Sequence, residues 1–297
     1  MTAPSNAGQG PIQGPVLVCG AGLMGHGIAQ VFAAVGHPVT LYEPDLGRAA
    51  AGRQRIAGNL ERAVVKGRLT AEARDEQLAR ISPSADLPAA AEGTILVVEA
   101  VFEDEVVKRA LLADLDRLAP PAAVLASNTS SISITRLAES VAPGRRPLVV
   151  GMHFFSPVPV MPLIELVRGA RTDDVTELAV RGWAAEIGKQ VIVSRDSPGF
   201  IVNRILMPYL AEAMRALEEG IGTPEDIDAG ARLGLNHPMG PLELADFIGL
   251  DVCLHIMEVL FEGFGQPHMA PPTVLREHVA AGRLGQKSGR GFYTYPR

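Results

Sequence analysis

One of the seven histidines occupies a position suited to catalysis. His153 ends the apolar run 148–152, and Phe154 and Phe155 follow it. In open α/β sheets, ligands bind beyond the carboxyl ends of the strands, where such a histidine would lie. An imidazole can take the proton of an alcohol while hydride leaves for a nicotinamide. The position therefore favours His153 as the general base of an alcohol dehydrogenation.

A catalytic histidine usually has a carboxylate partner, and Glu165 is the nearest acid that follows His153. It stands in the otherwise apolar run 163–167, so it needs a polar partner if it is buried. His153 is the obvious candidate, and a surface acid is the open alternative. The other histidines fit surface or packing roles. None forms an H-E-x-x-H spacing, and we therefore expect no metal site.

A glycine loop lies near the start of the chain, directly after the apolar run 16–19. It reads G-x-G-x-x-G, with glycines at Gly20, Gly22 and Gly25. These allow, in order, a tight turn, close approach of the backbone to a pyrophosphate, and close packing of helix on strand. The helix begins with Leu23 and Met24, whose free N–H groups attract phosphates. The loop predicts a dinucleotide site, with a purely structural glycine turn as the alternative.

Glu43 lies at the end of the second predicted strand, directly after the run 39–42 and about 20 residues beyond the first glycine. An acid there accepts hydrogen bonds from the adenosine ribose and repels a 2′-phosphate. Asp45 is a second candidate, but it lies beyond Pro44 and is expected to point away. The cofactor predicted is therefore NAD rather than NADP.

The elements that must position these residues alternate between strand and helix. Strand-like runs apolar on both faces recur at 16–19, 39–42, 95–98, 124–126 and 148–150, with helical patterns at 23–35, 46–68, 105–118 and 134–141. This order predicts an α/β fold of the Rossmann type, with a doubly wound, mainly parallel sheet. Two more strand candidates, 163–167 and 191–193, flank a helix that contains Trp183.

The pattern changes at the D-S-P-G segment 196–199, beyond which helices dominate. Pro208 is expected to kink or interrupt the helix 200–219, and only 292–295 resembles a strand. We therefore predict a disordered leader over residues 1–14, a Rossmann domain over 15–197 and an all-α domain over 198–297.

Composition excludes several classes of partner and site. The formal net charge of −6 argues against nucleic acid as a partner. No apolar run approaches the roughly 20 residues that span a bilayer, so no membrane partner is expected. The two cysteines, Cys19 and Cys253, are far apart, which fits a reducing cytoplasm.

Several separated motifs together resemble the L-3-hydroxyacyl-CoA dehydrogenases, a family that includes 3-hydroxybutyryl-CoA dehydrogenases. They are S-N-T-S at 127–130, H-F-F-S-P-V-P-V-M at 153–161, Glu165, P-G-F-I-V-N-R at 198–204, H-P-M-G-P-L-E at 237–243 and G-R-G-F-Y at 289–293. The resemblance covers everything after the leader. It implies NAD-dependent interconversion of (S)-3-hydroxyacyl-CoA and 3-oxoacyl-CoA, with short chains favoured, and a homodimer formed through the helical domain.

The resemblance also implies roles for individual residues. His153 is implied as the base and Glu165 as the group that orients it. Ser130 and Asn203 are implied to hold the 3-oxygen of the substrate and the histidine in register. Further cofactor contacts are implied for Glu103 and Lys108 near the nicotinamide ribose, and for Lys287 in the tail. Ser156 departs from the family, which usually has asparagine there, so a contact to cofactor or substrate is lost or replaced by water.

The segment 46–68 carries a local excess of positive charge. Its basic residues are Arg48, Arg53, Arg55, Arg62, Lys66 and Arg68, against the single acid Glu61. A solvated helix face explains most of them, and binding of the CoA phosphates is the functional alternative. The resemblance places CoA contacts near Asn59 and Lys66.

Three other functions remain open at this point. Related dehydrogenases on this scaffold act on L-gulonate or carnitine rather than on thioesters. A non-catalytic NAD-binding protein is a second alternative, although it would not require the whole set Ser130, His153, Glu165 and Asn203. A piece of a multifunctional β-oxidation enzyme is the third, without a hydratase-like region in this chain.

Overall fold

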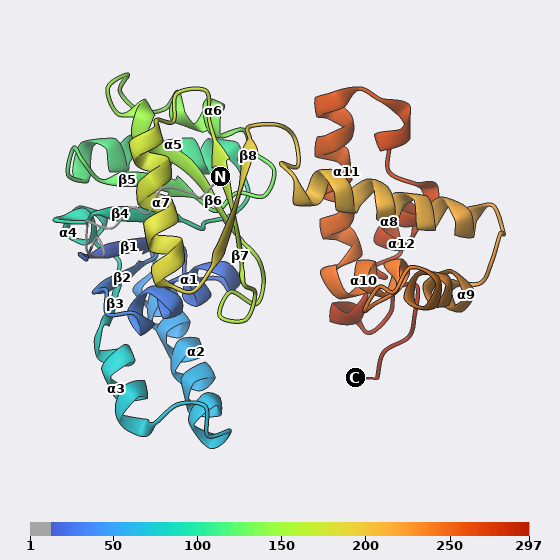
Figure 1. Cartoon of the computed structure of the whole chain (residues 1–297), viewed down its shortest axis with the longest axis horizontal. Helices are drawn as coiled ribbons and strands as arrows, with labels where there is room; N and C mark the ends of the chain where they lie inside the picture. The colour runs from blue at the N-terminus through green and yellow to red at the C-terminus, as the bar shows by residue number, and fades with distance from the viewer. Residues whose placement is uncertain (1–12, 297) are drawn as a thin grey trace, which may run out of the picture. The chain divides into compact units, whose positions relative to one another are not determined.

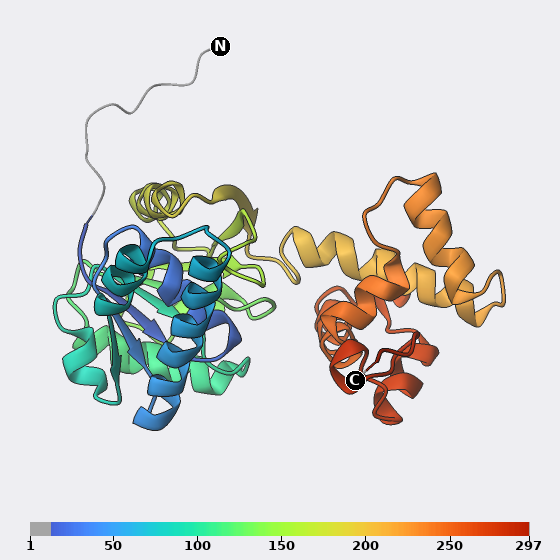
Figure 2. The same ribbon diagram turned by 90° about the horizontal axis from the view of Figure 1, so that it is seen from below.

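The computed structural model describes residues 13–296 of the chain (Figures 1 and 2). The predicted leader, 1–14, lies outside these residues except for Gln13 and Gly14. The chain divides into two compact units between Asp196 and Ser197. The first unit carries the glycine loop and His153, whereas the second carries Asn203.

The first unit is built on a single sheet of eight strands in the order β3-β2-β1-β4-β5-β6-β7-β8. The strands are β1 (Val16–Cys19), β2 (Val39–Tyr42), β3 (Ile81–Ser84), β4 (Leu96–Glu99), β5 (Val124–Ser127), β6 (Val149–Phe154), β7 (Leu163–Arg168) and β8 (Gln190–Arg195). All neighbours are parallel except β6 and β7, which run antiparallel. The first six strands follow the order of a Rossmann fold, so the predicted fold class is confirmed.

Helices cover both faces of this sheet, as Figures 1 and 2 show. They are α1 (Leu23–Ala34), α2 (Leu46–Val65), α3 (Ala71–Ala79), α4 (Leu87–Ala91), α5 (Glu105–Leu118), α6 (Ile134–Ala138) and α7 (Asp174–Glu186). Helices α1, α2 and α7 pack on one face through a core that includes Phe32, Ile56 and Trp183. In Figure 1, α7 lies in front of the sheet and α5 and α6 lie behind it. Burial on both faces explains why most strands read as continuous apolar runs.

Three elements between α2 and β4 were not predicted from the sequence. Helix α3 has no buried residue and therefore lacks an apolar stripe; Thr70 starts it by accepting a hydrogen bond from the Ala73 amide. Strand β3 contains Pro83 between two serines and lies at the edge of the sheet, where a missing N–H is tolerated. Helix α4 is too short to show a period. The expected helix 46–68 accordingly ends earlier, at Val65.

The second unit is helical. Its helices are α8 (Val202–Glu218), α9 (Pro224–Ala229), α10 (Pro241–Ile248), α11 (Leu250–Phe264) and α12 (Thr273–Ala280). Of the kink or interruption expected at Pro208, the interruption is wrong, because α8 continues through it, and the kink stays a prediction. Met207 and Leu210 on either side pack into the core of this unit, which offsets the hydrogen bond that proline cannot donate.

The strand expected at 292–295 is also wrong. The described tail forms isolated bridges only, such as Arg290 with Thr294. The amides of Phe292 and Tyr293 instead donate to the buried carboxylate of Asp246, each at 3.0 Å, and are not available to a sheet. Among residues 13–296, no helix combines the length and apolar character needed to cross a membrane.

Candidate functional site

The glycine loop joins β1 to α1 at the carboxyl edge of the sheet. Gly20 has a φ of +100°, and a Cβ there would collide with the carbonyl group of Ala100. A Cβ at Gly25 would overlap the carbonyl oxygen of Gly20, so only glycine lets α1 pack this closely. A Cβ at Gly22 would meet no atom within 4 Å, which leaves the backbone open on the side of the helix start. This open cradle at a helix N-terminus fits a pyrophosphate.

Glu43 closes the loop from the end of β2. Its carboxylate accepts a hydrogen bond of 2.8 Å from the amide of Ala21, inside the glycine loop. Asp45 has a different task, because its side chain accepts from the amides of Gly47 and Arg48 and caps α2. The two acids therefore have different roles, and Glu43 is the one that contacts the glycine loop. This arrangement fits the ribose contact predicted for Glu43.

His153 and Glu165 face each other across the antiparallel strands β6 and β7. They are direct partners in the register of the pair, so their side chains lie on the same face of the sheet. The Nδ1 atom of His153 is 3.0 Å from Oε2 of Glu165. Glu165 is fully buried and His153 nearly so. Because Nδ1 is held by the carboxylate, Nε2 lies on the far side of the ring, where it can exchange a proton with a ligand.

Ser130 is held by Glu103. One oxygen, Oε1, accepts from the amide and hydroxyl of Ser130, at 2.9 and 3.3 Å, and from the hydroxyls of Thr129 and Ser131. Burial alone would raise the pKa of the Glu103 carboxyl, but the charge of Lys108 and these hydrogen bonds outweigh it and lower that pKa. Glu103 therefore stays ionised and fixes the loop after β5.

Lys108 is buried beneath this loop, between two carboxylates. Its ammonium lies 2.6 Å from Oε1 of Glu99 and 3.2 Å from Oε2 of Glu103. Glu99, at the end of β4, also accepts from the Ser127 hydroxyl at 2.6 Å and from the Val101 amide at 2.8 Å. The structure thus places Lys108 as a support for Glu103. A direct contact of Lys108 with the nicotinamide ribose stays a prediction.

Two residues that hold the backbone near this site were not singled out from the sequence. The side-chain oxygen of Asn128 accepts a hydrogen bond of 2.8 Å from the Phe154 backbone amide. The backbone amide of Asn128 donates to the Glu99 carbonyl. It therefore ties the ends of β4 and β6 on either side of β5, and its signal was the S-N-T-S motif. Asp196, interpreted only as part of a domain boundary, accepts from the Ser133 hydroxyl and from the first amides of α6.

Two models of one protein family match the chain, one over each unit. The model of the 3-hydroxyacyl-CoA dehydrogenase NAD-binding domain matches residues 15–197. The model of the C-terminal domain of the same family matches residues 199–295. The chain belongs to the 3-hydroxyacyl-CoA dehydrogenase family. The resemblance drawn from its motifs is confirmed, as are the enzyme class and NAD as cofactor.

Individual relatives cover nearly the whole chain. A 3-hydroxybutyryl-CoA dehydrogenase of Mycobacterium tuberculosis is 49% identical over 94% of this chain and 97% of its own length. One from Bradyrhizobium diazoefficiens is 50% identical over 94% of each chain. The crystal structure of the (S)-3-hydroxybutyryl-CoA dehydrogenase of Ralstonia eutropha superposes with a TM-score of 0.91, at 44% identity, and covers 95% of this chain and 99% of that one.

The remaining predicted residues of this dehydrogenase lie in different settings. Ser156 is exposed at the start of the loop after β6. Asn203 lies in the first turn of α8, within the second unit. Lys287 also belongs to the second unit, where its ammonium lies 2.6 Å from Oδ2 of Asp251 at the start of α11. Their contacts with cofactor or substrate stay predictions.

The basic helix α2 borders a hollow of about 480 Å³. Residues lining it include His26, Arg55, Asn59 and Arg62. Asn59 donates to Gln30 on α1 at 3.2 Å and accepts from Arg62. Lys66 is exposed at the end of α2, seven residues after Asn59, and so shares its face of the helix. This face offers cations and amides to an anionic group.

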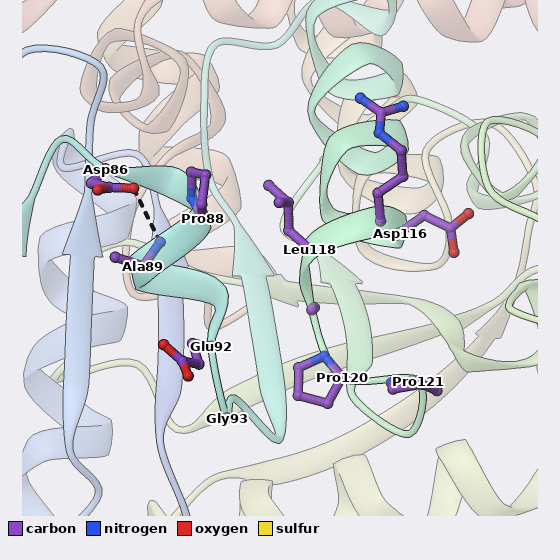
Figure 3. A pocket seen from close by; sticks show the side chains of 11 residues that line it. Asp86, Pro88, Ala89, Glu92, Gly93, Asp116, Leu118, Pro120 and Pro121 are labelled. Atoms are coloured by element: carbon purple, nitrogen blue, oxygen red, sulfur yellow. Dashed lines mark hydrogen bonds between the residues drawn. The ribbon is translucent and has the colours of Figure 1, made fainter.

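A second hollow, of about 710 Å³, lies at the opposite edge of the sheet (Figure 3). It opens between α4 and the end of α5, at the amino ends of β4 and β5, and Asp86, Glu92 and Asp116 line it. Asp86 caps α4 through the Ala89 amide, as Figure 3 shows. Ligands of such sheets bind at the other edge, and these acids repel phosphates. Across the described residues, no group of His, Cys, Asp or Glu is arranged to hold a metal ion.

Proposed function

We propose that this dehydrogenase interconverts (S)-3-hydroxybutyryl-CoA and acetoacetyl-CoA with NAD. The observation that carries the proposal is the His153–Glu165 pair, 3.0 Å apart on adjoining strands at the ligand-binding edge of the sheet. The names of relatives that are nearly half identical over their whole length support the short-chain thioester.

The chemistry assigned to each side chain follows from this geometry. His153 takes the hydroxyl proton of the substrate on Nε2, and Glu165 stabilises the imidazolium that forms. NAD, when bound, would accept the hydride that C3 gives up. Ser130 and Asn203 hold the 3-oxygen beside the histidine. In the reverse direction, His153 returns its proton to the 3-oxygen of acetoacetyl-CoA.

The remaining binding roles are assigned by position. The amides of Leu23 and Met24, at the start of α1, face the pyrophosphate across the glycine cradle. Glu43 takes the adenosine ribose. Glu103, Lys108, Ser156 and Lys287 complete the nicotinamide end. The α2 face with Asn59 and Lys66 takes the phosphates of CoA, helped by Arg55 and Arg62 beside the same hollow.

We further assign a homodimer formed through the helical unit, and a cytoplasmic place in fatty-acid β-oxidation. Large apolar side chains exposed in that unit support the dimer, since such side chains favour burial against a partner. They are Ile205, Ile221, Leu233, Leu235, Phe247, Val252 and Phe261. Cys19 and Cys253 are both buried free thiols, which suits a reducing compartment.

The test is a substrate panel with NADH, in which acetoacetyl-CoA is compared with longer 3-oxoacyl-CoAs. L-gulonate and carnitine, assayed with NAD, represent the non-thioester alternatives. We expect the highest kcat/KM with acetoacetyl-CoA, and a loss of about 10²- to 10⁴-fold in kcat on His153→Gln. Near-wild-type turnover by His153→Gln, or preference for L-gulonate or carnitine, would contradict the proposal. Tight NADH binding without turnover of any thioester would favour a non-catalytic role.

A further inference from the structure

Lys189 is a nearly buried cation between the end of α7 and the start of β8. Its side chain is 9% exposed. The ammonium donates two hydrogen bonds of 2.7 Å, to the carbonyl oxygens of Val158 and Met161. Burial lowers the pKa of Lys189, as expected for an ammonium removed from water. The two carbonyls are therefore the groups that stabilise this charge inside the protein.

The end of α7 fixes the place of Lys189. Gly188 adopts a φ of +71° and donates its amide to Ala185, while the amide of Lys189 donates to Ala184 at 2.7 Å. These two bonds form a Schellman motif, which ends the helix and sets the direction of the following chain. The next amide, of Gln190, donates to Pro162 at 2.7 Å and begins β8. Lys189 is thus held on both sides.

The segment that Lys189 holds is the connection between the two catalytic strands. Residues 155–162 join β6, which carries His153, to β7, which carries Glu165. Within this loop the amides of Val160 and Met161 both donate to the Pro157 carbonyl. The loop is therefore a compact turn, and the Val158 and Met161 carbonyls both converge on the Lys189 ammonium.

The same loop packs against the helix of the glycine loop. Val158 is 2% exposed and belongs to the core of the first unit. A Cβ added at Gly27 of α1 would lie 2.9 Å from Cβ of Val158, so the two backbones approach closely at this point. Figure 1 shows the end of α7 and the loop between β6 and β7 at the same end of the domain, beside α1. Val158 is wedged between Lys189 and the NAD helix.

We propose that Lys189 is a positioning residue for the dehydrogenase reaction. By holding the Val158 and Met161 carbonyls, it seats the β6–β7 loop on α1 and so fixes the His153–Glu165 pair relative to the dinucleotide cradle. The proposal rests on the proposed function. Its consequence is large because a displacement of about 1 Å in a catalytic site costs on the order of 10²-fold in rate.

The first test compares Lys189→Met with Lys189→Arg. Methionine keeps the length and removes the donors, whereas arginine keeps charge and donors. We expect Lys189→Met to lower kcat for acetoacetyl-CoA reduction about tenfold or more, with KM for NADH changed less than about threefold. Amide exchange should accelerate at residues 158–162 in the protein without ligands. Lys189→Arg should recover most of the kcat.

A comparison of folded variants separates positioning from a merely structural role. Lys189→Met leaves the Val158 and Met161 carbonyls without their donor, and a buried acceptor left unsatisfied destabilises the folded state. We therefore expect the thermal midpoint of Lys189→Met to fall by several degrees, and kcat is compared at a temperature where circular dichroism shows every variant folded. A kcat within about twofold of wild type despite faster loop exchange would overturn the proposal. So would a kcat loss that Lys189→Arg shares in full.

A second pair of variants tests the seat of the loop on α1 through the Val158 side chain instead of its carbonyl, and it gives a readout even if Lys189→Met does not fold. Gly27→Ala pushes Val158 away from α1 while Lys189 is intact, and we expect it to lower kcat. Gly182→Ala, on α7, is the matched control, since a Cβ there meets no atom within 4 Å. Equal kcat in both alanine variants would overturn the proposal.

Failure of the proposed function would look different. In that case wild type would not reduce acetoacetyl-CoA, yet amide exchange at residues 158–162 would still respond to Lys189→Met. The kcat comparison would then be repeated with whichever substrate of the panel wild type turns over. Loss of kcat on that substrate upholds the role of Lys189, and an unchanged kcat overturns it.

Discussion

Two carboxylates at the same edge of the sheet are used in opposite ways. Glu165 faces the imidazole of His153, a group that can take up and release a proton, across a strand pair. Glu103 faces the ammonium of Lys108 and a set of fixed hydroxyl and amide donors. The His153–Glu165 pair can exchange a proton with a ligand, whereas the groups around Glu103 keep its carboxylate ionised. Glu165 is thus suited to act through His153, and Glu103 to keep the Ser130 loop in place.

The difference lies in how the chain delivers the partners. His153 and Glu165 come from two strands in direct register, so the ladder between β6 and β7 fixes their side-chain contact. Glu103 lies in a loop, and its donors come from the next loop after β5, with no ladder between them. The buried Lys108 and Glu99 supply the missing rigidity. A pair carried by neighbouring strands is positioned by their ladder, whereas a carboxylate in a loop needs a network of buried partners to position it.

Among the single variants that test this comparison, Glu165→Gln should give the largest loss of kcat. An amide can donate to Nδ1 and so trap the imidazole with its proton on Nε2, where it cannot accept one from substrate. We expect kcat for 3-hydroxybutyryl-CoA oxidation to fall between about 10²- and 10⁴-fold, with a smaller change in KM. Steady-state kinetics at saturating NAD measures this. A loss below about fivefold would show that Glu165 does not orient the base.

Lys108→Met should give a smaller loss with a distinct pH dependence. In wild type the pKa of Glu103 is lowered, so its anion persists into acid solution and is lost only as pH falls through that lowered pKa. Without Lys108 the burial of Glu103 remains, its pKa rises, and the anion is lost at higher pH. We expect about a tenfold loss in kcat/KM near pH 7 and an acid limb shifted upward.

The control for Lys108→Met is Arg109→Met on the same helix. Arg109 is partly exposed and lies 3.6 Å from Glu105, so its removal changes charge without touching the buried network. Both variants are assayed at a temperature where circular dichroism shows them folded. An acid limb that stays at the wild-type pH in Lys108→Met would refute the supporting role of Lys108.

Glu43→Ala should alter cofactor choice rather than chemistry. The variant loses the carboxylate that repels a 2′-phosphate, and the Ala21 amide loses its partner. We expect the ratio of kcat/KM for NADP to that for NAD to rise about tenfold, from a change of about 1.4 kcal/mol. An unchanged ratio would assign the ribose contact to another residue.

Asp45→Ala is the smallest perturbation and the matched control for Glu43. Asp45 caps α2 and is exposed, so its removal should cost about 1 kcal/mol of unfolding free energy. Denaturant unfolding measures this cost. The NADP-to-NAD ratio should not change, and a shift as large as that of Glu43→Ala would reverse the roles given to the two acids.

Much of this site was predictable because its geometry is carried by strands. The runs 16–19 and 39–42 match β1 and β2 as predicted, with β1 buried on both faces and β2 buried on one face and half-buried on the other. His153 and Glu165 lie on neighbouring apolar runs with a short connection, which leaves little room for anything but an antiparallel pair. The pairing was a prediction with a surface acid as its rival, and the structure decides for the pair.

What the sequence did not reveal depends on tertiary partners. β3 is an edge strand, with Pro83 and polar neighbours that hide its character. Lys189 resembles any surface lysine after a helix, because the carbonyls that bind it belong to a loop about 30 residues earlier. The role of Glu99 likewise cannot be predicted from the sequence, because it depends on the ion pair with Lys108 in the folded protein. Long-range hydrogen bonds to backbone leave no spacing pattern to find.

The central claim is that Glu165 acts through His153, and a double-mutant cycle on kcat tests it most directly. The four proteins are wild type, His153→Gln, Glu165→Gln and the double variant, each assayed by 3-hydroxybutyryl-CoA oxidation with saturating NAD. Residues that act as a unit are strongly non-additive. We predict that Glu165→Gln lowers kcat about 100-fold or more in wild type and less than about twofold in His153→Gln. Multiplicative losses in the double variant would contradict the account.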